Sequence, residues 1–209
     1  MKTFKSILIL TVCTVVLFAC KKDKENEEIV EATKKEELTR KIADIIPAQY
    51  QDTLTKLGIV INKDINPPSL SGGAYIYTPM VLFKSNRKED PANLRFLDSR
   101  VKFFDQDADN NIKFIGKNLL NTADTSIVTA ISGSGNQFTV YGKVKSVNGS
   151  NSAIFAIVMS GSKDGNVLRD IRMGLINIDN SKGGTVFIKQ GEARVVSDTD
   201  KISESIALF

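Results

Sequence analysis

The segment Gln137–Val147 reads QFTVYGKVKSV and alternates apolar with polar residues over most of its length. Successive side chains of an extended chain point to opposite faces, so Phe138, Val140 and Val144 share one face. Tyr141 lies on the other face, together with the polar residues. This alternation is typical of a strand in an antiparallel sheet with one face on the core and one face in water. The segment therefore predicts an antiparallel β fold.

Strand patterns continue on both sides of this segment, from Gly58 towards the C-terminus. β-Branched and aromatic residues dominate there, and clusters of Gly, Asn, Asp and Ser recur at short intervals. No helical pattern of useful length separates the expected strands, which argues against parallel βαβ crossovers. The strands are expected near Ala74–Lys84, Leu94–Phe104, Asn111–Lys117, Thr125–Ser132, Gln137–Val147, Ala153–Ser160, Leu168–Ile178, Thr185–Lys189 and Ala193–Val196.

The predicted fold class is all-β, an antiparallel eight- to nine-stranded barrel or sandwich preceded by an N-terminal helical segment. Barrel and sandwich both remain open, because both architectures bury alternate residues of each strand. One strand differs from the others, since Ala153–Met159 is apolar on both faces. We expect this strand at the centre of a sheet or beneath the helices.

Two helices are expected before the β region, over residues 29–58. The first has an apolar stripe at helical spacing, formed by Leu38, Ile42, Ile45 and Ile46. The second is expected to begin at Pro47 and to end at Gly58, with Tyr50, Leu54 and Leu57 as its stripe. Neither stripe is long enough for a coiled coil, so both are expected to pack against the core. The β domain then comprises residues 59–209.

The N-terminal region has the features of a secretory signal peptide over residues 1–19. Two lysines precede an uncharged apolar run, Ile7–Ala19. A membrane-spanning helix is the alternative, but it needs about 20 apolar residues and this run is shorter. The sequence Leu17-Phe18-Ala19-Cys20 resembles the lipobox of bacterial lipoproteins. The resemblance implies cleavage before Cys20 and a diacylglycerol and an acyl chain, such as palmitate, on this residue.

Two or more acyl chains hold a protein durably on a bilayer without a spanning helix. Lipidation of Cys20 therefore implies a lipid-anchored protein of the outer membrane, at the cell surface or on the periplasmic face. Residues 20–28 are dense in charge and are expected to form a solvated tether. Their acidic residues resemble the signal that takes Bacteroidetes lipoproteins to the outer face of the outer membrane. An ordinary hydrophilic spacer is the alternative.

A second resemblance covers most of the chain beyond the tether. The expected helix ends in Leu57-Gly58-Ile59, and Asn66-Pro67-Pro68-Ser69-Leu70-Ser71-Gly72-Gly73 then precedes an aromatic residue, Tyr75. This PPxLxG pattern, together with Gly135–Val140 and Gly191–Val195, resembles uncharacterised Bacteroidetes cell-envelope lipoproteins. The shared motifs look like structural turns and strand starts. The resemblance implies residence at the cell surface or in the periplasm and supplies no catalytic residues.

The composition excludes several classes of enzyme and site. The chain has no His and no Trp, and its two cysteines are Cys13 and Cys20. Catalytic triads with His, zinc sites built on His or Cys, and an intrachain disulfide in the mature protein are therefore excluded. Lys2 and Lys5 leave with the signal peptide, which lowers the formal net charge from +4 to +2. This charge is too weak to indicate nucleic-acid binding.

Asp105, Asp107 and Asp109 stand at alternate positions and are the candidate metal ligands, because oxygen ligands at this spacing suit Ca²⁺. The residues around them depart from a calcium-binding loop. Asn110 stands where an EF-hand has Gly, and Gly116 stands where it has a bidentate Glu. A hairpin turn rich in residues that tolerate a left-handed backbone is the alternative. Apart from the covalent lipid and this candidate calcium, no cofactor is expected.

Tyr75 and Tyr77 are the candidate ligand-binding residues. They share one face of the first expected strand, where two rings would form a stacking platform. Packing against the helices is the alternative. A group of charged residues near an expected hairpin is predicted to form ion pairs at one rim of the β domain. This group comprises Asp164, Arg169, Asp170 and Arg172.

These features favour a protein that binds rather than catalyses, and no catalytic residues are assigned. A β domain that binds a ligand or an envelope protein predicts a concave pocket or an exposed apolar patch. A hydrolase of the glycosidase type predicts two carboxylates about 5 to 9.5 Å apart in a cleft. A structural assembly lipoprotein predicts an unpaired edge strand. The expected partners are the membrane, through the lipid anchor, and an unknown ligand or envelope protein, but not nucleic acid.

Overall fold

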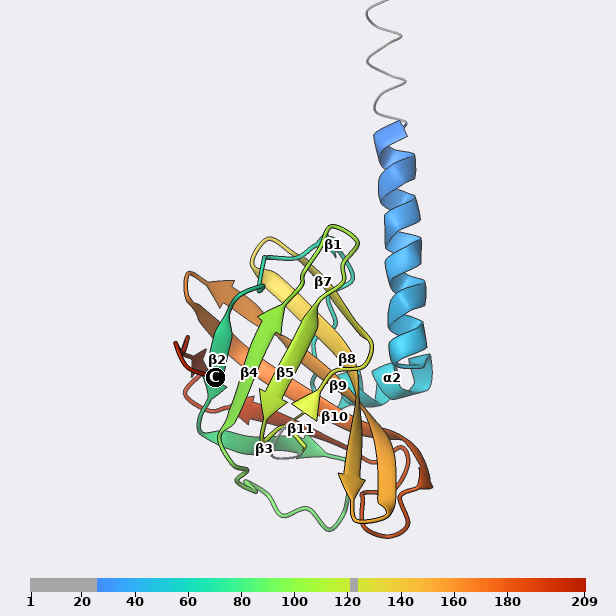
Figure 1. Cartoon of the computed structure of the whole chain (residues 1–209), viewed down its shortest axis with the longest axis vertical. Helices are drawn as coiled ribbons and strands as arrows, with labels where there is room; N and C mark the ends of the chain where they lie inside the picture. Colours follow the sequence, from blue (N-terminus) through green and yellow to red (C-terminus); the bar gives the residue numbers. More distant parts are fainter. Residues whose placement is uncertain (1–25, 121–123) are drawn as a thin grey trace, which may run out of the picture. The chain divides into compact units, whose positions relative to one another are not determined.

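A computed structural model of the chain describes residues 26–120 and 124–209 (Figure 1). The expected signal peptide, Cys20 and most of the expected tether lie outside the described residues. The chain divides into two units, Met1–Glu37 and Leu38–Phe209. Within the first unit residues 26–37 are helical, so residues 26–28, which were assigned to the tether, belong to a helix. Among the described residues, no helix combines the length and the apolar character needed to cross a membrane.

The second unit is mostly β and contains two sheets. Sheet A has the order β1-β7-β8-β9-β10-β11-β3, with β12 paired to β10, and sheet B has the order β2-β4-β5-β6. Neighbouring strands are antiparallel except for β1 and β7, which are parallel. In the described part of the chain neither sheet closes on itself.

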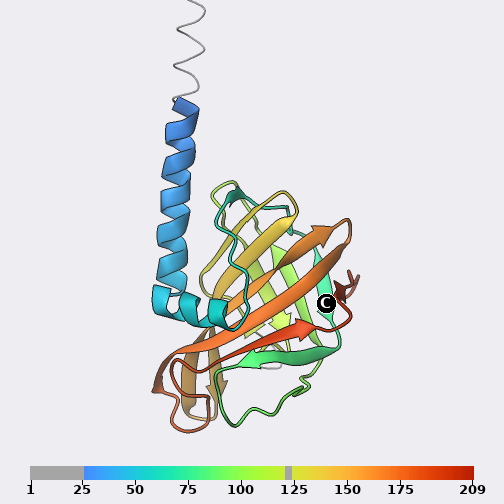
Figure 2. The same ribbon diagram turned by 180° about the vertical axis from the view of Figure 1, so that it is seen from behind.

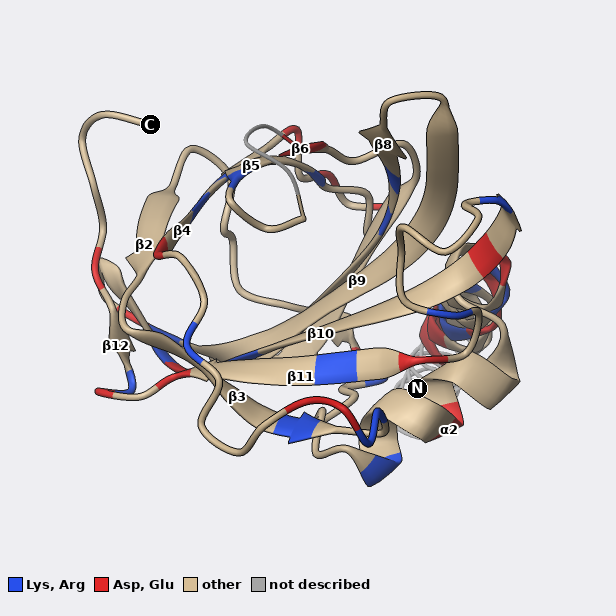
Figure 3. Ribbon diagram, turned by 90° about the horizontal axis from the view of Figure 1, so that it is seen from below, with Lys and Arg blue, Asp and Glu red and all other residues tan. Residues whose placement is uncertain are grey.

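Sheet A consists of β1 (Ile65–Asn66), β3 (Met80–Ser85), β7 (Thr129–Ser134), β8 (Gln137–Asn148), β9 (Asn151–Asp164), β10 (Val167–Lys182), β11 (Ala193–Asp198) and β12 (Ile202–Ser203). Sheet B consists of β2 (Ala74–Tyr77), β4 (Ser99–Phe104), β5 (Lys113–Lys117) and β6 (Asp124–Thr125). Lys and Arg are interspersed with Asp and Glu over the strands and loops (Figure 3), in keeping with the weak net charge.

The main apolar core lies between the two sheets. Sheet B lies in front of sheet A in Figure 1 and behind it in Figure 2. The inward face of β8 contributes Phe138, Val140 and Val144, as the alternating pattern predicted. Sheet B contributes Phe103 and Phe114, whose rings meet edge to face with centroids 6.4 Å apart. Both sheets therefore depend on one shared core.

The outward face of sheet A is also buried where α2 (Ala48–Lys56) and the neighbouring chain cover it (Figure 2). Gly174 of β10 lies beneath this cover. A Cβ atom at this position would lie 2.9 Å from Leu54 Cδ2 and 3.0 Å from Ile59 Cγ1. Both expected helical stripes are confirmed as core-packing faces. The second core cluster includes Leu38, Ile42, Ile45, Ile46, Leu54, Leu57, Ile59, Ala156, Val158, Ile176 and Val195.

Because residues of α2 and the following segment cover sheet A, outward-facing residues of β8 and β9 are buried. Tyr141 of β8 is fully buried, and its hydroxyl donates to the backbone oxygen of Asn62 at 3.1 Å. The expectation of a wet outer face is wrong at this position, because the segment after α2 runs over the strand. The expectation for β9 is confirmed. It lies between β8 and β10, with Val158 in the outer core cluster and Met159 in the inner one.

The strand predictions fail mainly at the sheet edges, and the described residues contain twelve strands rather than eight or nine. The range Ala74–Lys84 forms two strands, β2 and β3, in different sheets. Pro79 lies between them and has no N–H to continue a ladder. The range Thr185–Lys189 is not a strand, although Phe187 packs against Phe155 with ring centroids 6.0 Å apart. Its apolar pattern reflects this packing and not sheet pairing.

Helix α2 ends at Lys56 with Leu57 as its C-cap, so the predicted C-terminal cap at Gly58 and Ile59 is confirmed, while Pro47 is its N-cap rather than its first residue. The N–H of Ile59 donates to the Leu54 oxygen at 3.0 Å, and the N–H of Gly58 donates to the Thr55 oxygen at 2.9 Å. These two bonds form a Schellman motif, which requires a left-handed residue just past the helix. Gly58 supplies it with a φ of +104°. The motif turns the chain so that Ile59 packs on sheet A.

We expect Gly58→Ala to destabilise the protein by about 2 kcal/mol. The added Cβ would lie 2.7 Å from Phe83 Cε1 and 3.3 Å from Arg172 Nη1, in a backbone conformation that side chains disfavour. Gly72→Ala is the matched control, because φ is +84° there but no heavy atom lies within 4 Å of the added Cβ. It should cost about 1 kcal/mol. Urea denaturation measures both losses, and equal values would show that the contacts at Gly58 contribute nothing.

Candidate functional site

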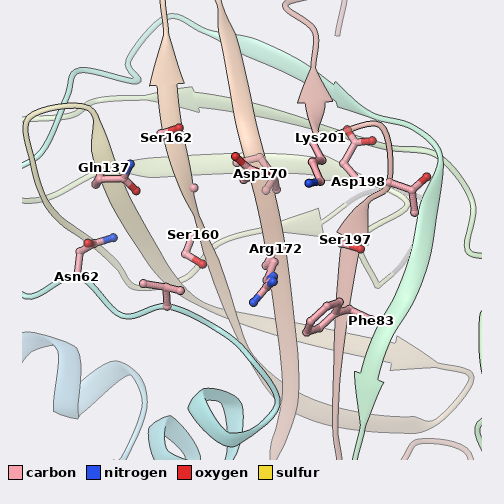
Figure 4. Close-up of a pocket in the computed structure, with 14 residues that line it drawn as sticks. Asn62, Phe83, Gln137, Ser160, Ser162, Asp170, Arg172, Ser197, Asp198 and Lys201 are labelled. Carbon is pink, nitrogen blue, oxygen red and sulfur yellow. The ribbon is translucent and has the colours of Figure 1, made fainter.

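A groove of about 460 Å³ lies on the outward face of sheet A, next to the area that α2 covers. Arg172 of β10 stands on its floor, paired across the ladder with Ser160 of β9 and with Ser197 of β11. Figure 4 shows the three side chains in one row. Directly paired residues on one face have Cβ atoms about 4.5 to 5.5 Å apart. Two small hydroxyl side chains therefore flank the base of the Arg172 side chain.

The walls of the groove come from the segment after α2 and from β3. Asn62 stands on one side and Phe83 on the other (Figure 4), and Val60 also lines the groove. The N–H of Asn62 donates to Thr139 Oγ1 at 3.0 Å, which fixes this wall to β8. Phe83 stands at an irregularity in the β3–β11 register. Val60 and Phe83 are 58% and 47% exposed, so the groove has apolar walls that face water.

The guanidinium group of Arg172 is held from two sides. Its Nη1 donates to the backbone oxygen of Gly58 at 2.6 Å, and its central carbon lies 4.1 Å from the centroid of the Phe83 ring. No ion pair between Arg172 and a carboxylate occurs within residues 26–120 and 124–209. The carbonyl and the cation–π contact fix the group without neutralising it. The groove therefore presents one immobilised positive charge.

One end of the groove is formed by a bulge in β10. The register with β9 shifts between Arg169 and Arg172, and Asp170 within the shift has a φ of +52°. The N–H of Asp170 donates to the backbone oxygen of Lys201 at 3.1 Å. Asp170 and Lys201 are both exposed and both line the groove. The rim thus adds one charge of each sign.

The ion-pair cluster expected at this rim forms in part. Arg169 Nε lies 2.6 Å from Asp164 Oδ2, as predicted. Arg172 does not join this pair, because the bulge separates the two arginines and Arg172 is engaged with Gly58 and Phe83. Sequence reasoning therefore missed its position in a groove.

The candidate metal ligands are not brought together, and no group of three metal-ligating side chains occurs in the described part of the chain. Asp105 pairs instead with Lys113 at 2.9 Å. The Asp107 carboxylate accepts the side chain of Asn111 at 2.7 Å and the backbone N–H groups of Asp109 and Asn111, and these bonds lower its pKa. The segment is the loop between β4 and β5, which corresponds to the hairpin alternative.

Tyr75 and Tyr77 form neither a platform nor a contact surface for the helices. Both are buried between the two sheets, with 3% and 0% exposure. The Tyr75 ring centroid lies 6.2 Å from that of Phe103, and the Tyr77 hydroxyl lies 3.9 Å from Met159 Sδ. Their shared face was predicted correctly, but that face meets the inner core. Neither ring is accessible to a ligand.

Asp198, at the end of β11, is a buried carboxyl group with one unpaired oxygen. Its Oδ2 accepts the Ser203 hydroxyl at 2.7 Å and the Thr78 N–H at 3.3 Å, while Oδ1 has no hydrogen-bond partner. Asp198 also lines the groove, but successive strand residues point to opposite faces, so its carboxyl group points away from Ser197. Burial, and then the nearby Asp200, raise the pKa of Asp198 to about 6.

We expect Asp198→Asn to change how stability depends on pH. A carboxyl group with a raised pKa in the folded state stabilises the protein below its ordinary pKa, and this contribution is lost as the pH rises through about 6. As the pH rises from 4 to 7, the free energy of unfolding of the variant should therefore increase by about 2 kcal/mol relative to that of the wild type. Denaturant titrations at several pH values measure this gain.

Asp52→Asn, at an exposed position on α2, is the control and should follow the wild-type profile. The bond with Arg194 is the main cause that lowers the pKa of Asp90 to about 2. Asp90 therefore makes stability change with pH in the opposite direction, but it is present in the wild type and in both variants, so its effect cancels in the comparison. Parallel profiles for the wild type and Asp198→Asn would contradict the assignment of Asp198.

No family model matches the chain. Comparisons with curated proteins and with solved structures also gave no match.

Proposed function

We propose that the chain is a lipid-anchored cell-envelope lipoprotein whose β domain binds a ligand, without catalysis, in the groove around Arg172. The observation that carries this proposal is the fixed, unpaired guanidinium group in an open groove of about 460 Å³. Small-molecule sites usually occupy about 300 to 1,000 Å³. The core shared by the two sheets supports a sandwich-like arrangement, in which sheet A offers a rigid floor for the ligand.

The anchor is assigned to Cys20, on the sequence features described above. The apolar run that ends in Leu17-Phe18-Ala19-Cys20 and the charged residues after it support export, acylation and attachment to the outer membrane. The resemblance to Bacteroidetes cell-envelope lipoproteins supports the same location. In this proposal the lipid holds the protein at the membrane and the β domain meets its ligand in the surrounding water.

Binding is favoured over carboxylate-pair hydrolysis by the two aspartates that line the groove. Asp170 is exposed at the rim, whereas the carboxyl group of Asp198 is buried and bonded to Thr78 and Ser203. A glycosidase-type pair requires both carboxyl groups to reach one substrate bond. The buried group is not available for this purpose.

A structural assembly role is less well supported by the four edge strands of the described sheets. β1 and β6 comprise two residues each, and β3 and β2 already have partners. Along β3, the N–H of Leu82 donates to the Leu94 oxygen at 2.8 Å. Along β2, the N–H of Ile76 donates to the Glu204 oxygen at 3.0 Å. Strand addition needs a free row of backbone groups. The neighbouring chain occupies part of that row on each strand.

We expect Cys20→Ala to release the protein from membranes. The wild type should fractionate with the outer membrane, and mass spectrometry of the mature protein should find an acylated N-terminal Cys20. The matched control is Cys13→Ala, which changes a cysteine inside the expected signal peptide and should fractionate like the wild type. Membrane partition of Cys20→Ala, or an unmodified Cys20 thiol in the wild type, would refute the anchor.

We expect small polar molecules to bind at the groove in preference to other surfaces. A fragment screen by amide NMR on the full chain in detergent measures this preference. Shifts should concentrate at Ser160, Arg172 and Ser197 and should be absent at Leu97 and Asn118, which line another hollow on sheet B. Shifts spread evenly over the surface, or confined to sheet B, would show that the groove is not a binding site.

A further inference from the structure

We infer that the groove binds a hydroxylated monocarboxylate of sugar size, with the ligand's carboxylate on Arg172. This inference rests on the proposed function, since it names the chemistry of the ligand for the same groove. It is carried by three properties of the described residues: the free donors of Arg172, the balance of charge around it and the hydroxyl groups beside it.

The free donors of Arg172 fit a carboxylate. A guanidinium group has five N–H donors in a rigid plane and binds carboxylates through two parallel hydrogen bonds. Among the described residues one acceptor is bonded to it, the Gly58 oxygen at 2.6 Å. The contact with Phe83, 4.1 Å from the ring centroid, holds the plane in place. The group is therefore ordered before a ligand arrives, which lowers the entropic cost of binding.

The balance of charge favours a monoanion over a phosphate ester. Arg172 and Lys201 each bring one positive charge to the groove. The exposed Asp170 brings one negative charge, and the buried Asp198, which also lines the groove, brings a second when it is ionised. A phosphate monoester carries about −1.5 to −2 at pH 7 and would meet repulsion from Asp170. A carboxylate carries one charge and is matched by Arg172 alone.

The side chains beside Arg172 favour a ligand with hydroxyl groups. Ser160 and Ser197 are the cross-strand neighbours of Arg172 in the ladder, and Ser162, Gln137 and Asn62 also line the groove. Hydroxyl and amide groups both donate and accept hydrogen bonds, so they suit the hydroxyl groups of a sugar ring. The exposed Val60 and Phe83 add apolar walls for its C–H faces.

Three probes that differ in one chemical group test the inference. D-Glucuronate, D-glucose and D-glucose 6-phosphate share a pyranose ring and carry a carboxylate, a hydroxymethyl group and a phosphate ester. Calorimetry on the full chain, in a detergent without a sugar headgroup, should give an affinity for glucuronate about tenfold or more above those for the other two. Amide NMR should place the bound glucuronate at Ser160, Arg172 and Ser197.

Two variants at one position test the role of Arg172 without altering it. Ser197 is the cross-strand partner of Arg172, so Ser197→Asp places a carboxylate beside the guanidinium group, and Ser197→Asn is its uncharged match. Ser197→Asp should bind glucuronate about tenfold more weakly than Ser197→Asn, because its own carboxylate occupies Arg172. Arg172→Gln should lose glucuronate binding, whereas Arg100→Gln, on sheet B, should keep it. If Arg172→Gln does not fold, the comparison of Ser197→Asp with Ser197→Asn still tests whether the ligand's carboxylate binds Arg172.

The outcomes separate this inference from the proposed function. Equal binding of glucuronate and glucose at the groove would overturn the carboxylate assignment and leave the binding site intact. Preference for glucose 6-phosphate, or equal glucuronate binding by Ser197→Asp and Ser197→Asn, would overturn it too. If all three probes fail while other fragments shift the groove residues, the ligand class is wrong. If no fragment shifts these residues, the proposed function fails as well.

Discussion

Sheet A has to bury both of its faces, and the rest of the structure depends on this requirement. Its inner face packs on sheet B, and its outer face carries a second apolar cluster that needs its own cover. Residues 38–62 supply that cover. Gly174 allows their close approach, since a side chain at this position would collide with Leu54 and Ile59. The cap at Gly58 then directs the chain along the sheet.

The groove begins where the apolar pattern on the outer face ends. Outward positions recur every second residue along a strand, and on three neighbouring strands the next outward residue is polar. The changes are Val158 to Ser160 on β9, Gly174 to Arg172 on β10, and Val195 to Ser197 on β11. Ladder pairing aligns these three changes into one row. The same alternation that builds the core therefore also builds the floor of the candidate site.

The features that sequence reasoning predicted are those that depend on local pattern. The helical stripes, the cap at Gly58, the buried strand β9 and the loop that contains Asp107 all follow from neighbours in the chain. The candidate site depends instead on pairing between strands far apart in sequence. Arg172 becomes a groove residue only through its register with β9 and β11, and Tyr77 becomes a core residue only because sheet B covers sheet A. Periodicity gives the face of a residue but not what meets that face.

The contrast between two arginines of sheet A shows why Arg172 is assigned the binding role. Arg194 donates through Nε and Nη2 to both oxygens of Asp90, at 2.7 Å each, and the Asp90 side chain is 4% exposed. Ser85 and Arg87 also bond this carboxylate, so its charge and that of Arg194 act within the protein. These bonds tie the loop after β3 to β11, and Arg194 and Arg87 together compensate the buried carboxylate. Arg172 has an equally fixed guanidinium group but no carboxylate beside it in the described residues, so its charge is available to an anion from solution.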